Sequence, residues 1–249
     1  MRHCVNGCKT SGSGCHATRP KAWQILALLC LAGPHFGILY NFGMPLTKLS
    51  HAVIISPGMS MLVAVLLTAM SVRQVSTAAR LIGMALLLVA LSLIALDLGS
   101  SDGPAQMWRG DLVFVLTGTL YGVFSFLLGR WKADAVAITL WILAVSLLMV
   151  GPWYLAVATP TTHPPSAWAL QFVVQGVLGG GWAIVLYALS IRHLGAGRAG
   201  IFPALVPGAA AVLSIPISGV LPSGLEGLGC LLAPVGMFLT LRDSKRPPN

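Results

Sequence analysis

The stretch AVAITLWILAVSLLMVGPWYLAVA, residues 135–158, contains no charged side chain. A helix of that length crosses the roughly 30 Å hydrocarbon core of a bilayer. No run shows the strict alternation of a barrel strand, and lipid excludes unpaired backbone groups, so such runs predict helices. We therefore predict an all-α integral membrane protein with eight transmembrane helices. The other seven runs are 22–46, 50–70, 78–96, 110–128, 167–191, 199–220 and 225–241.

The composition excludes a soluble globular domain. Only 8% of the residues are charged, whereas a soluble domain carries about 25%, and 56% are hydrophobic. The net charge of +9 does not require nucleic acid as a partner, because anionic lipid headgroups attract basic residues beside membrane-spanning helices. The lipid bilayer is therefore the expected macroscopic partner.

Basic residues fall mainly on one side of the predicted membrane. If the chain crosses at every run, thirteen of the fifteen Lys and Arg residues share a side, and only Lys48 and Arg109 lie opposite. Basic loops stay on the cytoplasmic side of membrane proteins. We therefore expect both termini in the cytoplasm and the protein in the plasma membrane (the inner membrane of a bacterium).

Both ends of the chain are polar, and residues 1–21 and 243–249 are predicted cytoplasmic tails. The first tail has no apolar core followed by a cleavage site, so it is not a secretory signal. Its cysteines and histidine match no common zinc-finger spacing, which favours a flexible tail over a metal site. We predict no metal and no cofactor. The residues concerned are Cys4, Cys8, Cys15 and His16.

Two parts of the chain are similar at an offset of 146 residues, which places Pro57 on Pro203 and Gly83 on Gly229. The copies are five predicted helices apart, an odd number, so they have opposite orientations in the membrane. Inverted repeats are typical of secondary transporters, whose halves move around a central binding site.

The two repeats differ in length. Residues 22–97 contain three predicted helices, and residues 110–242 contain five. We interpret the chain as the remnant of a ten-helix fold of two five-helix repeats, without its first two helices.

Four segments carry a family resemblance: SHAVIISPGMSM (50–61), SVRQVSTAARLIG (71–83), GAGRAGIFPALVP (195–207) and SGVLPSGLEGLG (218–229). The chain resembles the drug/metabolite transporter superfamily, specifically its EamA-type families, over residues 22–242. The resemblance implies two inverted five-helix repeats and the export or import of small metabolites.

Polar residues inside the predicted helices are candidates for a substrate cavity, because lipid cannot satisfy polar groups. Hydrogen bonds between helices are the alternative explanation. Three prolines are predicted helix breaks, with simple kinking as their alternative. The cavity candidates are His35, Asn41, Thr117, Tyr121, Ser125, Gln171, Gln175, Trp182 and Tyr187, and the prolines are Pro57, Pro203 and Pro207.

No carboxylate lies deep in a predicted helix, because Asp97 and Asp111 fall at helix ends. We therefore expect facilitated or weakly coupled transport rather than a carboxylate proton relay, and little effect of Asp111→Asn. His35 could relay protons, since imidazole ionises near neutral pH, but a buried neutral ring is favoured because charging it in lipid is costly.

Two pairs of glycines four residues apart predict faces that pack closely against neighbouring helices. They are Gly33 with Gly37, and Gly176 with Gly180.

These observations favour an exporter or permease of small metabolites or drugs that works by alternating access. A non-transporting fragment or assembly subunit is the main alternative. A membrane-embedded enzyme is remote, because an HExxH motif and Asp-rich diphosphate motifs are absent. Because two helices of the predicted cavity wall are missing, we expect poor transport by the chain alone. We expect the chain to form a homodimer, to collapse its cavity or to have a longer N-terminus.

Overall fold

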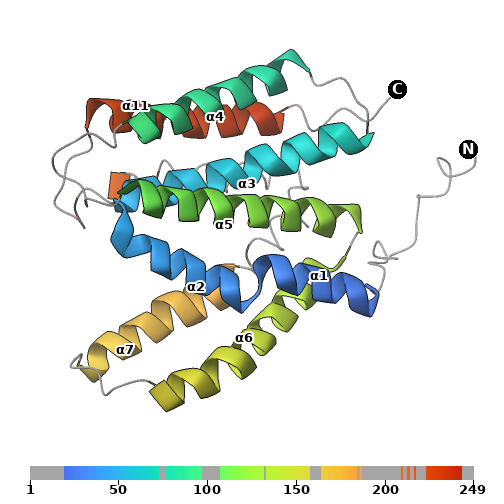
Figure 1. Cartoon of the computed structure of the whole chain (residues 1–249), viewed down its shortest axis with the longest axis vertical. Helices are drawn as coiled ribbons and strands as arrows, with labels where there is room; N and C mark the ends of the chain where they lie inside the picture. Colours follow the sequence, from blue (N-terminus) through green and yellow to red (C-terminus); the bar gives the residue numbers. More distant parts are fainter. Residues whose placement is uncertain are drawn as a thin grey trace, which may run out of the picture.

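A computed structural model describes residues 20–72, 77–96, 107–131, 133–157, 164–183 and 223–242, with residues 186, 209, 212, 213 and 216 described singly. Every regular element in this part of the chain is helical, as predicted (Figure 1). The elements are α1 (Ala22–Ala32), α2 (Pro34–Gly43), η1 (Met44–Leu46), α3 (Leu49–Val72), α4 (Ala78–Leu96), α5 (Met107–Arg130), α6 (Ala135–Val157), α7 (Pro165–Gln171), the π-helix η3 (Phe172–Trp182) and α11 (Gly224–Arg242).

Helix boundaries follow the apolar runs closely. The bounds of α4 are those predicted, and α3 and α5 extend their predicted runs by one to three residues at each end. The run at 167–191 is described over its first part as α7 and η3. The run at 199–220 lies almost entirely outside the described residues, so the count of eight helices stays a prediction.

The first apolar run is broken in its middle, at Gly33 and Pro34. Gly33 leaves the helical conformation, with φ −77° and ψ −160°, and Pro34 starts α2 at its first position. Proline cannot continue α1, because it lacks the N–H that would bond to the preceding turn. A side chain at Gly33 would collide with the carbonyl oxygen of Leu29, so glycine is required at this break.

The prediction that Pro57 breaks its helix is wrong. Helix α3 runs from Leu49 to Val72 with Pro57 inside it. Proline removes one backbone hydrogen bond, and helices packed among other helices tolerate this loss. The hydroxyl of Ser60 donates to the Pro57 carbonyl at 2.8 Å. Pro203 and Pro207 lie outside the described residues.

Helices α3 and α5 pack side by side in the middle of the molecule (Figure 1). Gly118 of α5 faces Ser56 of α3 so closely that an added Cβ would lie 2.5 Å from the Ser56 carbonyl oxygen. One turn later, Gly122 faces Ser60 in the same way, at 2.6 Å. Because residue numbers rise together along this contact, the two helices run parallel.

Helices α4 and α11 form a second close pair, which is antiparallel. An added Cβ at Gly83 would lie 2.7 Å from the Gly236 carbonyl oxygen and would also contact Thr240. At the other end of the pair, an added Cβ at Gly229 would lie 3.0 Å from the Ala90 carbonyl oxygen. The main core cluster joins α4 and α11 to α3 and α5 and includes Ile54, Ile55, Leu62, Leu87, Ala90, Ile94, Phe114, Ala233 and Met237.

The predicted glycine faces are not these close contacts. An added Cβ at Gly37 would meet no other atom within 4 Å, and at Gly176 the nearest side chain is Phe172 of the same helix, at 3.7 Å. Helical spacing identifies small residues on one face, but only the packed structure decides which of those faces meets a neighbour.

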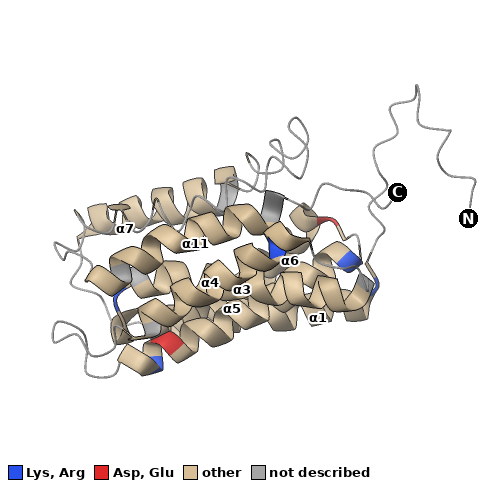
Figure 2. Cartoon of the chain, turned by 90° about the horizontal axis from the view of Figure 1, so that it is seen from above, with Lys and Arg blue, Asp and Glu red and all other residues tan. Residues whose placement is uncertain are grey.

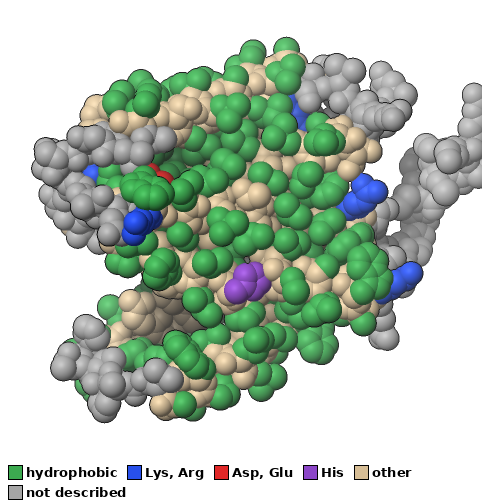
Figure 3. Space-filling model, viewed as in Figure 1, with side chains coloured by type: hydrophobic (Ala, Val, Ile, Leu, Met, Phe, Trp, Pro, Cys, Tyr) green, Lys and Arg blue, Asp and Glu red, His purple; other side chains and the backbone are tan. Residues whose placement is uncertain are grey.

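The outer surface is suited to lipid. Within the part of the chain that the structure describes, four spans are long and apolar enough to cross a membrane, namely Ala22–Leu46, His51–Ser71, Met107–Arg130 and Ala135–Ala156. The α6 span carries no charged side chain and is only 6% buried, so the surface that it exposes is uncharged. Among the described residues, Lys, Arg, Asp and Glu positions lie mostly near helix ends (Figure 2). The face in Figure 3 is largely covered by hydrophobic side chains.

Candidate functional site

A buried polar cluster joins the beginnings of α3 and α5. It consists of Thr47, on the turn before α3, His51 in the first turn of α3, and Asp111 in the second turn of α5. Their residue exposures are 6%, 0% and 7%, respectively. Three buried polar side chains at one place are unusual in a helix bundle whose other surfaces are apolar.

Close packing at Gly110 brings the cluster together. An added Cβ at Gly110 would lie 2.8 Å from the Thr47 Cβ and 3.0 Å from the Leu46 carbonyl carbon. The turn after η1 can therefore lie directly on α5, beside the adjacent Asp111. A side chain at position 110 would push the turn away from the carboxylate.

The Asp111 carboxylate contacts both Thr47 and His51. The Thr47 hydroxyl donates to Asp111 Oδ1 at 2.6 Å. His51 Nδ1 lies 3.0 Å from Oδ2 and 3.2 Å from Oδ1 of the same carboxylate. Beside an ionised carboxylate, which only accepts hydrogen bonds, the tautomer that fits this contact carries its hydrogen on Nδ1. The second ring nitrogen, Nε2, is buried and has no partner among the described residues.

Asp111 lies near the start of α5, as the sequence predicted. Its carboxylate is buried, accepts the Thr47 hydroxyl and lies 3.0 Å from the His51 ring, which the sequence did not predict. His51 and Thr47 were not among the predicted site residues. The sequence did offer one signal for this site, the histidine at position 51 near the start of an apolar run. Its partner Asp111 is 60 residues further along the chain, so the sequence did not show that the two side chains meet.

A small pocket opens onto this cluster between α3, α4 and α5, with a volume of about 280 Å³. Asp111 is its one ionisable side chain among the residues that line it. The others are Ile55, Met59, Leu91, Trp108, Leu112 and Val115.

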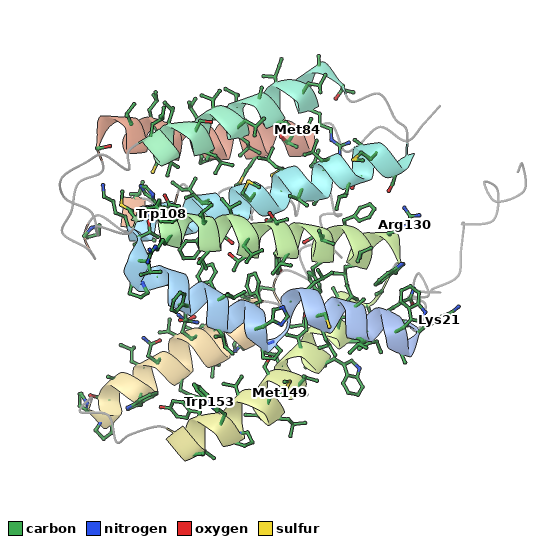
Figure 4. The ribbon with its side chains drawn as sticks, viewed as in Figure 1. Lys21, Met84, Trp108, Arg130, Met149 and Trp153 are labelled. Atoms are coloured by element: carbon green, nitrogen blue, oxygen red, sulfur yellow. The ribbon has the colours of Figure 1, made fainter. Side chains whose placement is uncertain are left out.

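A second, larger pocket of about 390 Å³ lies between α1, α2 and α6, at the Gly33–Pro34 break. Its wall is apolar except for His35 and Cys30. Figure 4 shows the labelled Met149 and Trp153 on α6, opposite α1 and α2. The remaining lining residues are Leu26, Leu29, Pro34, Ile38, Val145 and Val150.

The sequence was compared with models of known protein families. The model of the EamA-like transporter family matches residues 108–242, more than half of the chain. The chain belongs to the EamA-like transporter family. Neither a curated protein nor a solved structure matches it.

Membership makes this EamA-family chain an integral membrane protein with a membrane-transport role, and the family consists of transporters rather than enzymes. The match includes Asp111 and the whole of α6, whereas His35 and His51 precede it.

The structure separates the predicted cavity residues of this EamA-family chain. His35 lies on the wall of the larger pocket, and none of the other candidates that the structure describes is among the residues that line it. Asn41 and Ser125 bond within their own helices, to the carbonyl oxygens of Gly37 and Tyr121 at 2.8 Å each. Those two bonds stay within one helix, so they are neither cavity contacts nor the hydrogen bonds between helices of the alternative explanation.

The predicted polar stripe on α5 divides between two neighbours. Thr117 is fully buried against α3, 3.5 Å from the Ser56 hydroxyl. Tyr121 instead packs on Phe36 of α2, with ring centroids 5.6 Å apart. The residues are one turn apart, but α5 lies between α3 and α2, so they meet different helices.

The candidates on α7 and η3 lie on an exposed surface of the described structure. The side chains of Gln171, Gln175 and Trp182 are all exposed. Tyr187 lies outside the described residues.

Proposed function

We propose that this EamA-family transporter moves small, largely apolar organic molecules, metabolites or drugs, across the plasma membrane by alternating access. The observation that carries the proposal is the position of the larger pocket. Helices α1 and α2 belong to the first predicted repeat and α6 to the second, so the pocket lies between the two halves. Transporters with inverted repeats bind substrate at such an interface, where a helix is interrupted.

The chemistry of the wall suggests the substrate class. A mostly apolar pocket with one or two polar groups favours ligands that bury apolar surface and are oriented by few hydrogen bonds. His35 can donate and accept hydrogen bonds, and Cys30 is a weak donor. The pocket therefore favours amphipathic molecules with an apolar body over sugars or multiply charged metabolites.

The contact between α4 and α11 supports the inverted repeat. Gly83 meets Gly236 and Thr240. Its repeat mate, Gly229, meets Ala90 and Ile94, which precede Gly236 and Thr240 by the same 146 residues. A two-fold axis perpendicular to both helices exchanges these contacts, which is the relation expected for inverted halves.

Uptake into proteoliposomes tests the function. The reconstituted chain would be given labelled leucine, phenylalanine, uridine and the dye ethidium, with empty liposomes as the blank. Met149→Trp adds bulk inside the pocket, and Leu148→Trp adds the same ring on the neighbouring position, which is 73% exposed and does not line the pocket.

We expect the wild type to take up at least one panel compound that has an apolar body. Uptake should fall about tenfold in Met149→Trp and change less than about twofold in Leu148→Trp, because a loss of about 1.4 kcal/mol in binding is tenfold. Absence of uptake for the whole panel, or equal effects of the two variants, would contradict the proposed pocket.

A further inference from the structure

We propose that the last turns of α3 and α5 form a binding site for one anionic phospholipid. In this site the lipid phosphate contacts the guanidinium group of Arg130, and an acyl chain lies in a slot between the two helices, beside Gly129. The site does not depend on the proposed transport function, and it is separate from the larger pocket, which α1, α2 and α6 form.

The slot results from the separation of α3 and α5 toward their last turns. The helices touch at Gly118 and Gly122, where an added Cβ would lie 2.5 and 2.6 Å from carbonyl oxygens of α3. Gly129 lies about two turns beyond Gly122, so helical periodicity places it on the same face of α5. An added Cβ at Gly129 would nevertheless meet no atom within 4 Å. The two helices have therefore parted at this turn, and their ribbons diverge in the same direction in Figure 1.

The facing side of α3 is also uncovered at this end. Val63 of α3 contacts the Gly122 position, with its Cβ 2.7 Å from an added Cβ. Met70 lies about two turns beyond Val63, on the same face of α3. Val63 is partly buried, whereas Met70 is 76% exposed. Met70 and Gly129 therefore border an apolar slot that no side chain in the described part of the chain fills.

Arg130 crosses this slot at the ends of the helices. Its Nη1 donates a hydrogen bond to the Ser71 hydroxyl of α3 at 3.0 Å. Its Cζ lies 5.9 Å from the centroid of the Phe126 ring, one turn earlier on α5. A guanidinium group has five N–H donors, and the bond to Ser71 uses one of them. Arg130 has no other hydrogen-bond acceptor among the described residues, so the remaining donors are available to a ligand.

The position of Arg130 fits the headgroup layer of a membrane. The next residue, Trp131, packs edge-to-face on Trp23 of α1, with ring centroids 5.2 Å apart. Tryptophan rings favour the boundary between lipid and water. Arg130 and Lys21 lie at the same end of the bundle (Figure 4), which is the end expected in the cytoplasm. Anionic headgroups concentrate on the cytoplasmic side of membranes and attract basic side chains there.

The combination of charge and slot identifies the ligand class. The planar guanidinium fork matches the oxygen atoms of a phosphate group, and such charge-assisted hydrogen bonds are among the strongest in proteins. A free phosphate ion would use the guanidinium but leave the slot empty, whereas a phospholipid uses both. Because α3 belongs to the first predicted repeat and α5 to the second, the bound lipid contacts both halves of the molecule.

Native mass spectrometry of the full chain from nonionic detergent micelles tests the site by counting bound lipids. The micelles would be titrated with phosphatidylglycerol, or with phosphatidylcholine of the same acyl chains. We expect the first phosphatidylglycerol to bind at least about tenfold more tightly than phosphatidylcholine, which is about 1.4 kcal/mol. In Arg130→Gln this preference should fall below about twofold, because the charged donors are lost.

Two further variants separate the slot and the guanidinium from general surface charge. Gly129→Leu fills the slot and keeps Arg130, and it should weaken phosphatidylglycerol binding about tenfold. Lys21→Gln is the matched control, because it removes one positive charge from an exposed position at the same end, and binding should change less than about twofold. Circular dichroism of each variant shows that its helices are retained.

Equal binding of the two lipids by the wild type would overturn the site. Equal losses in Arg130→Gln and Lys21→Gln would assign the binding to diffuse surface charge, and unchanged binding in Gly129→Leu would remove the slot. Glycerol phosphate, a soluble anion with the same phosphate ester but no acyl chain, should not displace the bound lipid. Full displacement by glycerol phosphate would identify a site for soluble phosphates and contradict the lipid proposal.

Discussion

At the scale of single residues, Asp111 shows how one carboxylate can be kept buried in an apolar bundle. Its partners are a hydroxyl at 2.6 Å and a ring nitrogen at 3.0 Å, and both come from the segment that packs on Gly110. Hydrogen bonds to an ionised group are stronger than those between neutral groups. The buried carboxylate therefore depends on Thr47 as well as on His51.

The Thr47 hydroxyl should stabilise the fold through this bond. Thr47→Val keeps the shape but removes the donor, and we expect a loss of about 1.5–3 kcal/mol in the free energy of unfolding, the range for hydrogen bonds to charged groups. Thr47→Ser retains the hydroxyl and should lose less. Denaturation of both variants in detergent, followed by tryptophan fluorescence, measures the difference, and equal stabilities would contradict the proposed bond energy.

At the scale of elements, glycines bring α5 against α3 and α4 against α11 so closely that their backbones touch. Apolar side chains are as soluble in lipid as in a protein core, so close van der Waals contact is a main source of helix association in membranes. Gly118 and Gly122 have this role in α5, whereas Gly129, on the same helix, has open space around it.

This difference predicts a contrast between two identical substitutions. Gly118→Ala places a methyl group 2.5 Å from the Ser56 carbonyl oxygen and should cost about 1–3 kcal/mol, as overpacking does. Gly129→Ala meets no atom within 4 Å and should be neutral or slightly stabilising, because alanine favours helix. Unfolding titrations in mixed micelles would compare them, and the idea fails if Gly129→Ala is the more damaging change.

At the scale of the whole molecule, charge is distributed between two ends of an apolar bundle. Lys21 at the start of α1 and Arg130 at the end of α5 lie at one end, and Trp108 lies at the other (Figure 4). The Lys21 and Arg130 end is the one expected in the cytoplasm from the bias of basic residues. The Thr47–His51–Asp111 cluster lies at the Trp108 end, and under this orientation it faces the outside.

Cysteine labelling in intact cells tests the orientation. In a background with the five native cysteines replaced by serine, Asp102→Cys should react with a membrane-impermeant maleimide and Lys245→Cys should not. Permeabilised cells provide the control, in which both positions should react. Labelling of position 245 alone in intact cells would reverse the proposed topology and place the cluster on the cytoplasmic side.

Local sequence patterns predicted the helical class and most helix boundaries correctly, because a bilayer-spanning helix is encoded by a run of apolar residues and needs no distant partner. The same local reading failed at Pro57, which it took for a break, and missed the break at Gly33. Whether a helix tolerates proline depends on its neighbours, which a single run does not contain.

The candidate sites divide in the same way. The sequence by itself determined that His35 is a polar group within an apolar run, and the tertiary structure decided that it lies on a pocket wall while Tyr121 packs on Phe36. Only the tertiary structure decided that Asp111 is buried and bonded to His51, 60 residues earlier. The physical reason is that the environment of a side chain is set by helices that meet in space, and in this chain glycine contacts select which helices meet.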